Sequence, residues 1–344
     1  MNRAPSSAAA MGKLVTVAVP IYKRLEYLPK VLKVVEAQSY PHVELLVSDN
    51  GMNGDVVRDR VAAAYRRRYA FRQNPQSVSI AQHYNQMVHA AAGDYLVILP
   101  DDDEISPHFV AQLVARFDQH PDASVGFGRQ EFVDATGHVL GQSAESLPES
   151  MSGPDFIMAT WRHYSFGFQT VTTFLAKTEA VRACGGFPDF PRGTHIDDAL
   201  VIKLCLTGRV VFSSASTYRN LVDASSTGWS VSFEQLAAAV RQFMRFVDHD
   251  PTTKAFAASH PTKWPALRGC LVEMSWRMYL WRWRDIYRRR LSFLQWIRAG
   301  FAIPFIPAYY RSALQEMIAP LPASRAAGIS SSSPKATSPA RPRS

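Results

Sequence analysis

The stretch YLVILPDDD, residues 95–103, joins an apolar run to three consecutive aspartates. A short continuous run of aliphatic and aromatic side chains is typical of a strand that is buried on both faces of a sheet. The run stops at Pro100, where the polar residues begin. The stretch therefore predicts a core strand whose carboxyl end holds a cluster of acids.

Two earlier stretches have the same character, LVTVAVPIY at residues 14–22 and VELLVSDNG at residues 43–51. Three segments have the helical spacing of apolar residues: 26–38, 55–70 and 79–94, the last ended by Gly93. This alternation predicts βαβ units with a parallel sheet and right-handed crossovers. Since ligands of open α/β sheets bind beyond the carboxyl ends of the strands, we expect the site at these three ends.

The rest of the sequence predicts further helices and strands, and the whole chain divides into four predicted regions. We expect a helix at 106–119, a strand at 124–134, a loop at 141–155, a strand, short helix and glycine turn at 170–187, a helix at 195–207 and a strand at 209–216. Long helical patterns begin near residue 233. The predicted regions are a flexible N-terminus (1–12), an α/β domain (13–225), a helical region rich in Arg and aromatic residues (226–318) and a disordered tail (319–344).

Composition narrows the class of protein. The 344 residues are 47% hydrophobic and 19% charged, which is ordinary for a globular chain. The 3 cysteines form no C-x-x-C pair, which argues against a disulfide framework or zinc ribbon and favours a reducing cytosol. Residues 1–13 lack the apolar core of a signal peptide, and no apolar window reaches the ~18 residues of a membrane span. We therefore expect a cytoplasmic protein.

The net charge is +9, and residues 276–311 concentrate arginine and aromatic side chains. One interpretation is a helical hairpin that packs its aromatics on the rest of the protein. The other is a basic, aromatic surface that lies on an anionic membrane, peripheral at its inner face. The chain has no recognisable nucleic-acid module, so we expect no nucleic-acid partner.

The acids at 101–103 have three interpretations: a solvated turn with a helix cap, a general acid/base pair, or ligands of a divalent cation. The cation explains the clustering best, because a dication offsets the repulsion between neighbouring carboxylates. Oxygen ligands suit Mg²⁺ or Mn²⁺, usually together with substrate phosphates. The chain has neither G-x-x-x-x-G-K-[ST] nor, after the first strand, G-x-G-x-x-G, so a diphosphate must be bound by other means.

Five stretches carry a family resemblance: VAVPIYKRLEYLPKVLKVVEAQSY, ELLVSDNGMNGD, AGDYLVILPDDDE, GGF and DDALVIKLCLTG. In this order and spacing, over about residues 13–220, they resemble the family 2 glycosyltransferases. The resemblance implies an α/β GT-A fold, with a Rossmann-like, mostly parallel sheet flanked by helices and, here, a C-terminal helical extension. It also implies inverting transfer of a sugar from a nucleoside-diphosphate sugar, assisted by Mg²⁺ or Mn²⁺.

The resemblance further implies an acceptor hydroxyl on a saccharide or a polyprenyl-linked saccharide, in bacterial surface polysaccharide synthesis. Two alternatives stay open. One is a transferase that acts on a protein or a soluble small molecule. The other is a non-catalytic module that binds sugar nucleotides.

The resemblance also assigns roles on the nucleotide side. Pro20 and Tyr22 lie beside the base and ribose, and Asp49 contacts the nucleobase while its side chain can also cap the turn before Gly51. Diphosphate or base contacts, or plain surface positions, are predicted for three further residues: Lys23, Arg72 and Asn74. Asp103 is the metal-binding acid, with Asp101 or Asp102 on ribose or metal. Which two of these three aspartates hold the metal stays open.

A second acid pair lies in THIDDALVIKL, residues 194–204. Thr194 and Asp197 have the spacing of a helix cap, and acids in a first helical turn favour the helix dipole. The resemblance implies instead that Asp198 is the catalytic base, with Asp197 as its neighbour on the acceptor side. The histidine that many relatives have after the last strand is absent here, and neither Arg219 nor Asp223 is assigned in its place.

Overall fold

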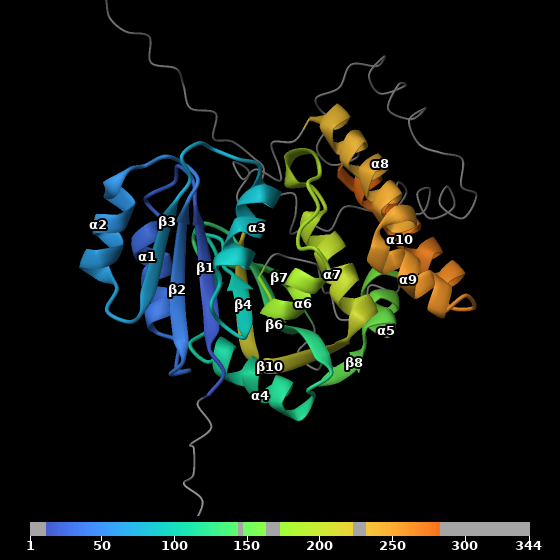
Figure 1. The fold of residues 1–344 in the computed structure, drawn as a ribbon, viewed down its shortest axis with the longest axis horizontal. Helices are drawn as coiled ribbons and strands as arrows, with labels where there is room; N and C mark the ends of the chain where they lie inside the picture. The colour runs from blue at the N-terminus through green and yellow to red at the C-terminus, as the bar shows by residue number, and fades with distance from the viewer. Residues whose placement is uncertain (1–11, 144–146, 163–172, 223–231, 283–344) are drawn as a thin grey trace, which may run out of the picture.

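The computed structural model describes residues 12–143, 147–162, 173–222 and 232–282. A 10-stranded sheet runs through the molecule with helices on both faces (Figure 1). The strand order along the main path is β3-β2-β1-β4-β9-β6-β10-β5. This is the α/β architecture expected from the alternation of strands and helices.

The first half of the sheet is parallel. Its strands are β1 (Val15–Ile21), β2 (Val43–Asp49), β3 (Tyr69–Gln73) and β4 (Tyr95–Ile98). β1 lies between β2 and β4, and its last residue, Ile21, is paired with Asp49 of β2. The polar segments after these strands therefore meet at one edge of the sheet, as the sequence predicts.

The second half of the sheet is mixed. Its strands are β5 (Glu104–Ile105), β6 (Ala123–Val133), β7 (Val139–Gln142), β8 (Ser150–Ser152), β9 (Leu175–Lys177) and β10 (Arg209–Leu221). The short β9 runs antiparallel between β4 and β6, and the long β10 runs parallel to β6. β10 also pairs with β5, which directly follows the three aspartates. A strand far along the chain is thus brought beside the acid cluster.

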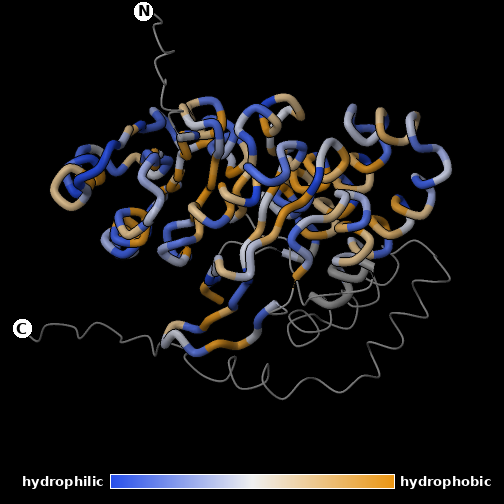
Figure 2. The backbone as a smooth tube through the Cα atoms, turned by 90° about the horizontal axis from the view of Figure 1, so that it is seen from below, coloured by the Kyte–Doolittle hydropathy of each residue, from blue (hydrophilic) through white to orange (hydrophobic). Residues whose placement is uncertain are grey.

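Alternate residues of the strands pack against opposite helical layers. One layer consists of α1 (Leu28–Glu36), α2 (Asp55–Ala64) and α4 (Phe109–Gln119), and the other includes α3 (Ile80–Ala90), α6 (Thr178–Ala183) and α7 (Ile196–Thr207). In β1, Val17 joins the first core and Ala18 the second. Hydrophobic strands accordingly run through the centre of the molecule (Figure 2). Burial on both faces explains why these strands read as unbroken apolar runs.

The C-terminal helices pack on the second layer, beside α7 and the short α5 (Gly153–Ile157) (Figure 1). They are α8 (Phe233–His249), α9 (Pro251–Ser259) and α10 (Trp264–Arg282). A capping box between Ser232 and Gln235 begins α8. Across the described ranges, none of the helices has the length and apolar character to cross a membrane.

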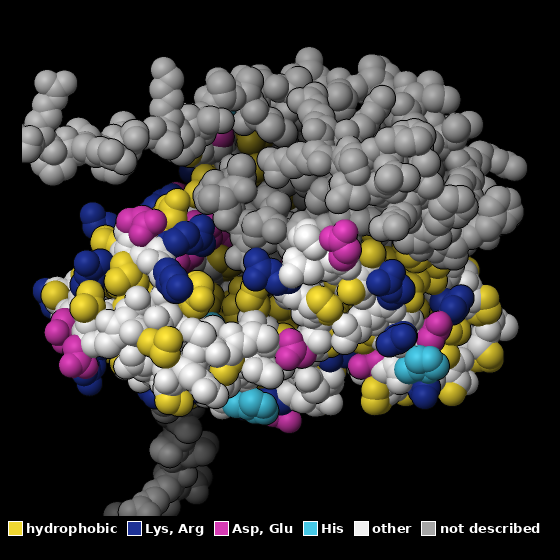
Figure 3. Space-filling model, turned by 90° about the horizontal axis from the view of Figure 1, so that it is seen from above, with side chains coloured by type: hydrophobic (Ala, Val, Ile, Leu, Met, Phe, Trp, Pro, Cys, Tyr) yellow, Lys and Arg dark blue, Asp and Glu magenta, His cyan; other side chains and the backbone are white. Residues whose placement is uncertain are grey.

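The basic, aromatic segment 276–311 lies mostly outside the described residues, as does the whole of 319–344. The first residues of segment 276–311 belong to α10, where Trp276 and Tyr279 are buried against α8. On the described surface seen from above, Lys and Arg side chains are spread among acidic and apolar ones (Figure 3). Trp276 and Tyr279 thus pack in the interior, and the relation of the segment to a membrane stays a prediction.

Two elements differ from the sequence-based expectation. Residues 55–70 do not form one helix, because α2 ends at Ala64 and β3 begins at Tyr69. β3 is an edge strand with exposed or half-buried residues throughout, so it lacks the apolar run that marks the inner strands. Residues 141–155 are not a loop either, since they contain the end of β7, β8 and the start of α5.

Gly93 does not end the helix at 79–94, because α3 stops at Ala90 and Ala91 is already extended. The glycine instead allows two segments of the backbone to approach each other closely. A Cβ there would lie 2.6 Å from the amide nitrogen of Thr16 and 2.8 Å from the carbonyl oxygen of Leu14. Both are backbone atoms of the segment that forms β1, so they cannot move aside cheaply.

We expect Gly93→Ala to lower the free energy of unfolding by roughly 1–3 kcal/mol, through this collision with the β1 backbone. Urea unfolding measures the change. Gly141→Ala in β7 is the matched control, because a Cβ there meets nothing within 4 Å. Equal effects of the two substitutions would contradict the role given to Gly93.

Candidate functional site

Asp49 closes the turn after β2. Its Oδ1 accepts hydrogen bonds from the Gly51 amide at 2.8 Å and from Asn53 Nδ2 at 2.8 Å, and its Oδ2 accepts one from the Asn53 amide at 2.8 Å. Asn53 Nδ2 also donates to the Tyr22 carbonyl at 2.6 Å, which joins the ends of β1 and β2. The buried carboxylate thus has the turn-forming role that the sequence allows, and it lies next to Tyr22.

The other residues that are predicted on the nucleotide side are either hydrogen-bonded within the protein or exposed. Asn74 is buried, and its Nδ2 donates to Asn50 Oδ1 at 2.9 Å, while Arg72 donates to the Gln86 carbonyl at 2.7 Å. These two side chains are tied into the protein. Tyr22 is 50% exposed beyond β1, with Lys23 Nζ 5.1 Å from its ring centroid. Tyr22 therefore offers an accessible aromatic face beside Asp49, whereas Asn74 is positioned to support the loop.

Arg24 bridges two of the three aspartates. Its guanidinium nitrogens lie 2.7 Å from Asp101 Oδ1 and 2.8 Å from Asp102 Oδ2. Burial raises the pKa of Asp101 to about 6, against the opposing effect of Arg24. A cation from the β1–α1 loop thus occupies the space between these two carboxylates.

Asp103 is held by residues of β10 instead. Its Oδ2 accepts a hydrogen bond from the Tyr218 hydroxyl at 2.6 Å, and its Oδ1 accepts from the Leu221 amide and from Asn220 Nδ2, both at 3.1 Å. Burial and the neighbouring Asp102 raise the pKa of Asp103 to about 8, although these three donors favour its ionised form. The carboxylate is held firmly, and no basic side chain among the described residues forms an ion pair with it.

Tyr84 of α3 is affected by the charges of both acid clusters. Burial raises its pKa, and the charges of Asp197, Asp103, Asp101 and Asp102 raise it further. One tyrosine hydroxyl is therefore within electrostatic range of both the strand-end acids and the helix acids. The structure brings together two clusters that lie about a hundred residues apart in the sequence.

The glycine turn between α6 and α7 is clamped onto α3. Asn85 Nδ2 donates to the Phe187 carbonyl at 2.8 Å, and the Phe187 amide donates to Asn85 Oδ1 at 2.8 Å. Gly186 has a φ of +65°, and a Cβ there would collide with Asn85 Oδ1. The buried Lys203 of α7 donates to the Cys184 carbonyl at 2.9 Å and to the Gly186 carbonyl. These contacts fix the turn against the start of α7.

The second acid pair occupies the first turn of α7. Asp198 is buried, and its Oδ2 lies 2.7 Å from Nδ1 of His195. Asp197 is half-buried and accepts a hydrogen bond from the Asp198 amide at 3.0 Å. Thr194 does not cap the helix, because the cap position belongs to His195, whose side chain makes no capping hydrogen bond.

The donor set of the strand-end acids fits a hard dication. Carboxylate oxygens are the ligands that Mg²⁺ and Mn²⁺ prefer, and two of these acids have raised pKa values that a positive ion would reverse. Within the described residues, no three His, Cys, Asp or Glu side chains converge as a preformed metal site. Substrate phosphates would have to complete the coordination, as is usual for Mg²⁺.

Several residues of the site escape sequence reasoning. Arg24 and His195 carry no pattern that marks them, and Tyr218 and Asn220 reach Asp103 across sequence separations of 115 and 117 residues. Arg219, considered in place of the absent histidine, is paired with Glu131 at 2.8 Å instead. Asp223 lies outside the described residues. The contacts of Asp103 with Tyr218 and Asn220 could have been predicted only from the pairing of β10 with β5.

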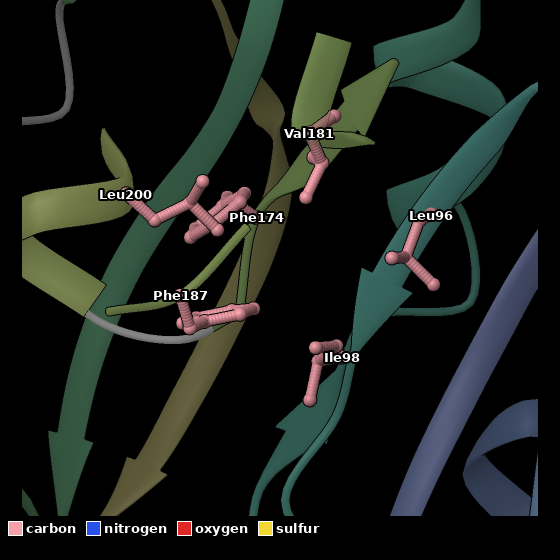
Figure 4. A pocket seen from close by; sticks show the side chains of 7 residues that line it. Leu96, Ile98, Phe174, Val181, Phe187 and Leu200 are labelled. Carbon is pink, nitrogen blue, oxygen red and sulfur yellow. The ribbon is translucent and has the colours of Figure 1, made fainter. Parts of the chain in front are cut away.

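A small apolar cavity lies in the core below the glycine turn. Its lining residues are all apolar: Leu96, Ile98, Phe174, Ala176, Val181, Phe187 and Leu200. Leu96 and Ile98 project into it from β4, opposite Phe174, Phe187 and Leu200 (Figure 4). It offers no group for chemistry, so we assign it to packing beneath the site.

The raised pKa of Asp103 predicts a pH dependence of stability. Since the folded-state pKa of about 8 lies above the ordinary 3.8, this group favours folding at low pH and loses that contribution as pH rises through about 8. Without divalent metal, the free energy of unfolding should decline by an amount on the order of a few kcal/mol between pH 5.5 and 8.5, and Asp103→Asn should flatten this decline, which is followed through the melting temperature at each pH. The exposed Asp118→Asn is the control, and a variant curve parallel to the wild type would refute the assignment.

Residues 16–185 match the family model described as Glycosyl transferase family 2. The glycosyltransferase GlyG of Streptococcus pneumoniae is 24% identical over 221 residues, which is 60% of this chain and 70% of GlyG. The protein y4gI of Sinorhizobium fredii is 33% identical over 119 residues, 33% of this chain. That match spans only 13% of the length of y4gI.

Two solved structures have a similar fold. Staphylococcus aureus TarS 1–349, in complex with UDP-GlcNAc, aligns with a TM-score of 0.61 at 16% identity, over 85% of this chain and 82% of TarS 1–349. The mannosyltransferase PcManGT of Pyrobaculum calidifontis, in complex with GDP-Man and Mn²⁺, aligns with a TM-score of 0.50 at 16% identity, over 90% of this chain and 85% of its own. By its matched domain and its fold, the chain is a transferase enzyme whose residues 16–185 form a family 2 glycosyltransferase domain of the GT-A fold.

Proposed function

We propose that this glycosyltransferase moves a sugar from a nucleoside-diphosphate sugar to a hydroxyl group with inversion at the anomeric carbon. One observation carries the proposal: two separate carboxylate clusters lie within electrostatic range of the same tyrosine, Tyr84. A single displacement needs one charged group for the leaving diphosphate and another for the attacking hydroxyl. The two clusters match this division of work.

On the leaving-group side, the nucleotide binds at the ends of β1, β2 and β4. Pro20 and Tyr22 contact the base and ribose, Asp49 contacts the base, and Asn74 supports the loop from below. Asp101 and Asp102 complete this side toward the ribose and diphosphate. The complexes of TarS with UDP and UDP-GlcNAc, and of PcManGT with GDP-Man, support a sugar nucleotide as the donor.

We further propose that Asp101 and Asp103 hold the divalent cation, Mg²⁺ or Mn²⁺, together with the diphosphate. When bound, the metal stabilises the negative charge that grows on the leaving diphosphate. The Mn²⁺ in the PcManGT complex supports such an ion. Arg24 must then release Asp101, and its freed guanidinium suits a diphosphate oxygen, since Arg recognises phosphate well.

On the acceptor side, Asp198 acts as general base and Asp197 contacts the acceptor. The acceptor hydroxyl gives its proton to Asp198 while its oxygen forms a bond to the anomeric carbon. The bond from that carbon to the diphosphate oxygen breaks on the opposite face, so the configuration inverts. The diphosphate leaves with the bonding electron pair, and no other reactant is needed.

We propose a saccharide or polyprenyl-linked saccharide as the acceptor, in synthesis of a bacterial surface polysaccharide. The enzyme would work in the cytoplasm, with the basic, aromatic segment 276–311, apart from the buried Trp276 and Tyr279, against the inner face of an anionic membrane. A protein or soluble small-molecule acceptor is the alternative within the enzyme class. Sedimentation with anionic vesicles at low salt, abolished by high salt, would favour the membrane-linked acceptor.

Asp198→Asn should lower the rate of sugar transfer by about 10²–10⁴-fold, because the amide cannot take the acceptor proton. Donor affinity, measured by calorimetry, should stay at the wild-type value. The exposed Asp59→Asn in α2 is the matched control for loss of a carboxylate. Full turnover by Asp198→Asn would exclude Asp198 as the base, and unchanged donor binding without any wild-type transfer would favour a binding module.

A melting-temperature panel with UDP, GDP, dTDP and CMP, each with and without Mn²⁺, identifies the base and the metal dependence. We expect one diphosphate, at 100 times its Kd in the presence of Mn²⁺, to stabilise the protein by about 2.7 kcal/mol, and the same concentration without Mn²⁺ to stabilise it less. Asp103→Ala should lose the Mn²⁺-dependent part. A calorimetric titration of this variant that matches the wild type would refute Asp103 as a ligand.

A further inference from the structure

His195 is placed unusually for a histidine. It stands immediately before α7, which begins at Ile196, and its φ of +67° lies in the left-handed region. Its side chain is only 4% exposed, and its ring centroid lies 5.3 Å from that of Phe243 in α8. A side chain other than glycine in this conformation costs about 1 kcal/mol or more, so something must hold it there.

The hydrogen bonds of the ring identify what holds it. Nδ1 lies 2.7 Å from Asp198 Oδ2, while Nε2 is buried and has no hydrogen-bond partner among the described residues. The ring does not cap α7, although the capping position would allow a shorter polar side chain to do so. The strained backbone and the buried ring therefore serve one contact, the bond to Asp198.

The two oxygens of Asp198 differ as a result. Oδ2 is occupied by His195, whereas in the described part of the chain no hydrogen bond reaches Oδ1. The Asp198 side chain is 12% exposed, so it is not sealed from solvent, and Oδ1 is the oxygen that His195 leaves unbound. With its proton on Nδ1, the imidazole donates to Oδ2 and leaves Oδ1 to accept from a substrate.

We propose that His195 is a positioning residue that fixes the carboxylate of Asp198 in one orientation and presents Oδ1 to the acceptor hydroxyl. This inference rests on the proposed role of Asp198 as the base. Misplacement of a catalytic group by about 1 Å can cost 10²-fold in rate, so a buried neighbour that sets one rotamer matters for kcat. His195 itself touches neither substrate nor reacting atoms.

Three variants separate this role from a purely structural one. His195→Phe keeps a buried ring but removes the donor, and it should lower kcat about 10- to 100-fold with donor Kd unchanged. His195→Asn places an amide N–H near the position of Nδ1 and tolerates the left-handed backbone, so it should recover kcat to within a few-fold of wild type. His89→Phe on the exposed end of α3 is the control for the substitution itself.

The outcomes are distinguishable from failure of the proposed function. In an Asp198→Asn background, His195→Phe should have no further effect on the residual rate, because the group that it positions is gone. Wild-type kcat in His195→Phe, or equal losses in the Phe and Asn variants, would overturn the positioning role. A loss of donor affinity as large as the loss of kcat would also overturn it. If Asp198→Asn alone keeps full turnover, the base assignment fails first, whatever the His195 variants do.

Discussion

Mutual repulsion between three consecutive carboxylates at the end of β4 is the constraint that organises this site. Two separate parts of the fold hold the three acids: Arg24 from the β1–α1 loop spans Asp101 and Asp102, while Tyr218 and Asn220 of β10 hold Asp103. The parallel core and the long β10 are thereby joined at one point. These contacts do not fully stabilise the ionised form of Asp103, because burial and Asp102 still raise its pKa to about 8. Because the fold does not fully stabilise the ionised carboxylates, the cluster favours the binding of a positive ion.

The second cluster depends on a different kind of support. Asp197 and Asp198 begin α7, and the direction of that helix follows from the glycine turn before it. Asn85 holds the turn from α3, and the buried Lys203 holds it from within α7. Burial lowers the pKa of Lys203, and its ammonium group finds carbonyl oxygens in place of a carboxylate. Backbone contacts thus set the distance between the two acid clusters, and no direct bond between acids is needed.

Sequence patterns predict the parts of this fold that local physics determines. The strands β1, β2 and β4 are unbroken apolar runs because both faces are covered, and α7 is a largely apolar segment that has two acids in its first turn and ends at a glycine. β3 escapes because an exposed edge strand has no such run. The candidate acids could be named from sequence, but their partners could not. Arg24 reaches Asp102 across 78 residues and Tyr218 reaches Asp103 across 115, and no local pattern encodes contacts of that separation.

Each acid cluster contains one residue in an energetically unfavourable state, and that residue is one to which a functional role is proposed. Asp103 keeps a raised pKa among neutral donors, and His195 keeps a left-handed backbone and a buried Nε2 without a partner in the described structure. A sequence selected for stability alone would place a short capping residue at position 195 and a neutral residue at 103. The rest of the core is well packed apolar surface, which supplies the stability that these two positions reduce. The location of the strain is therefore an argument for function that is independent of any family resemblance, and it favours Asp198, the acid that His195 holds, over Asp197 as the base.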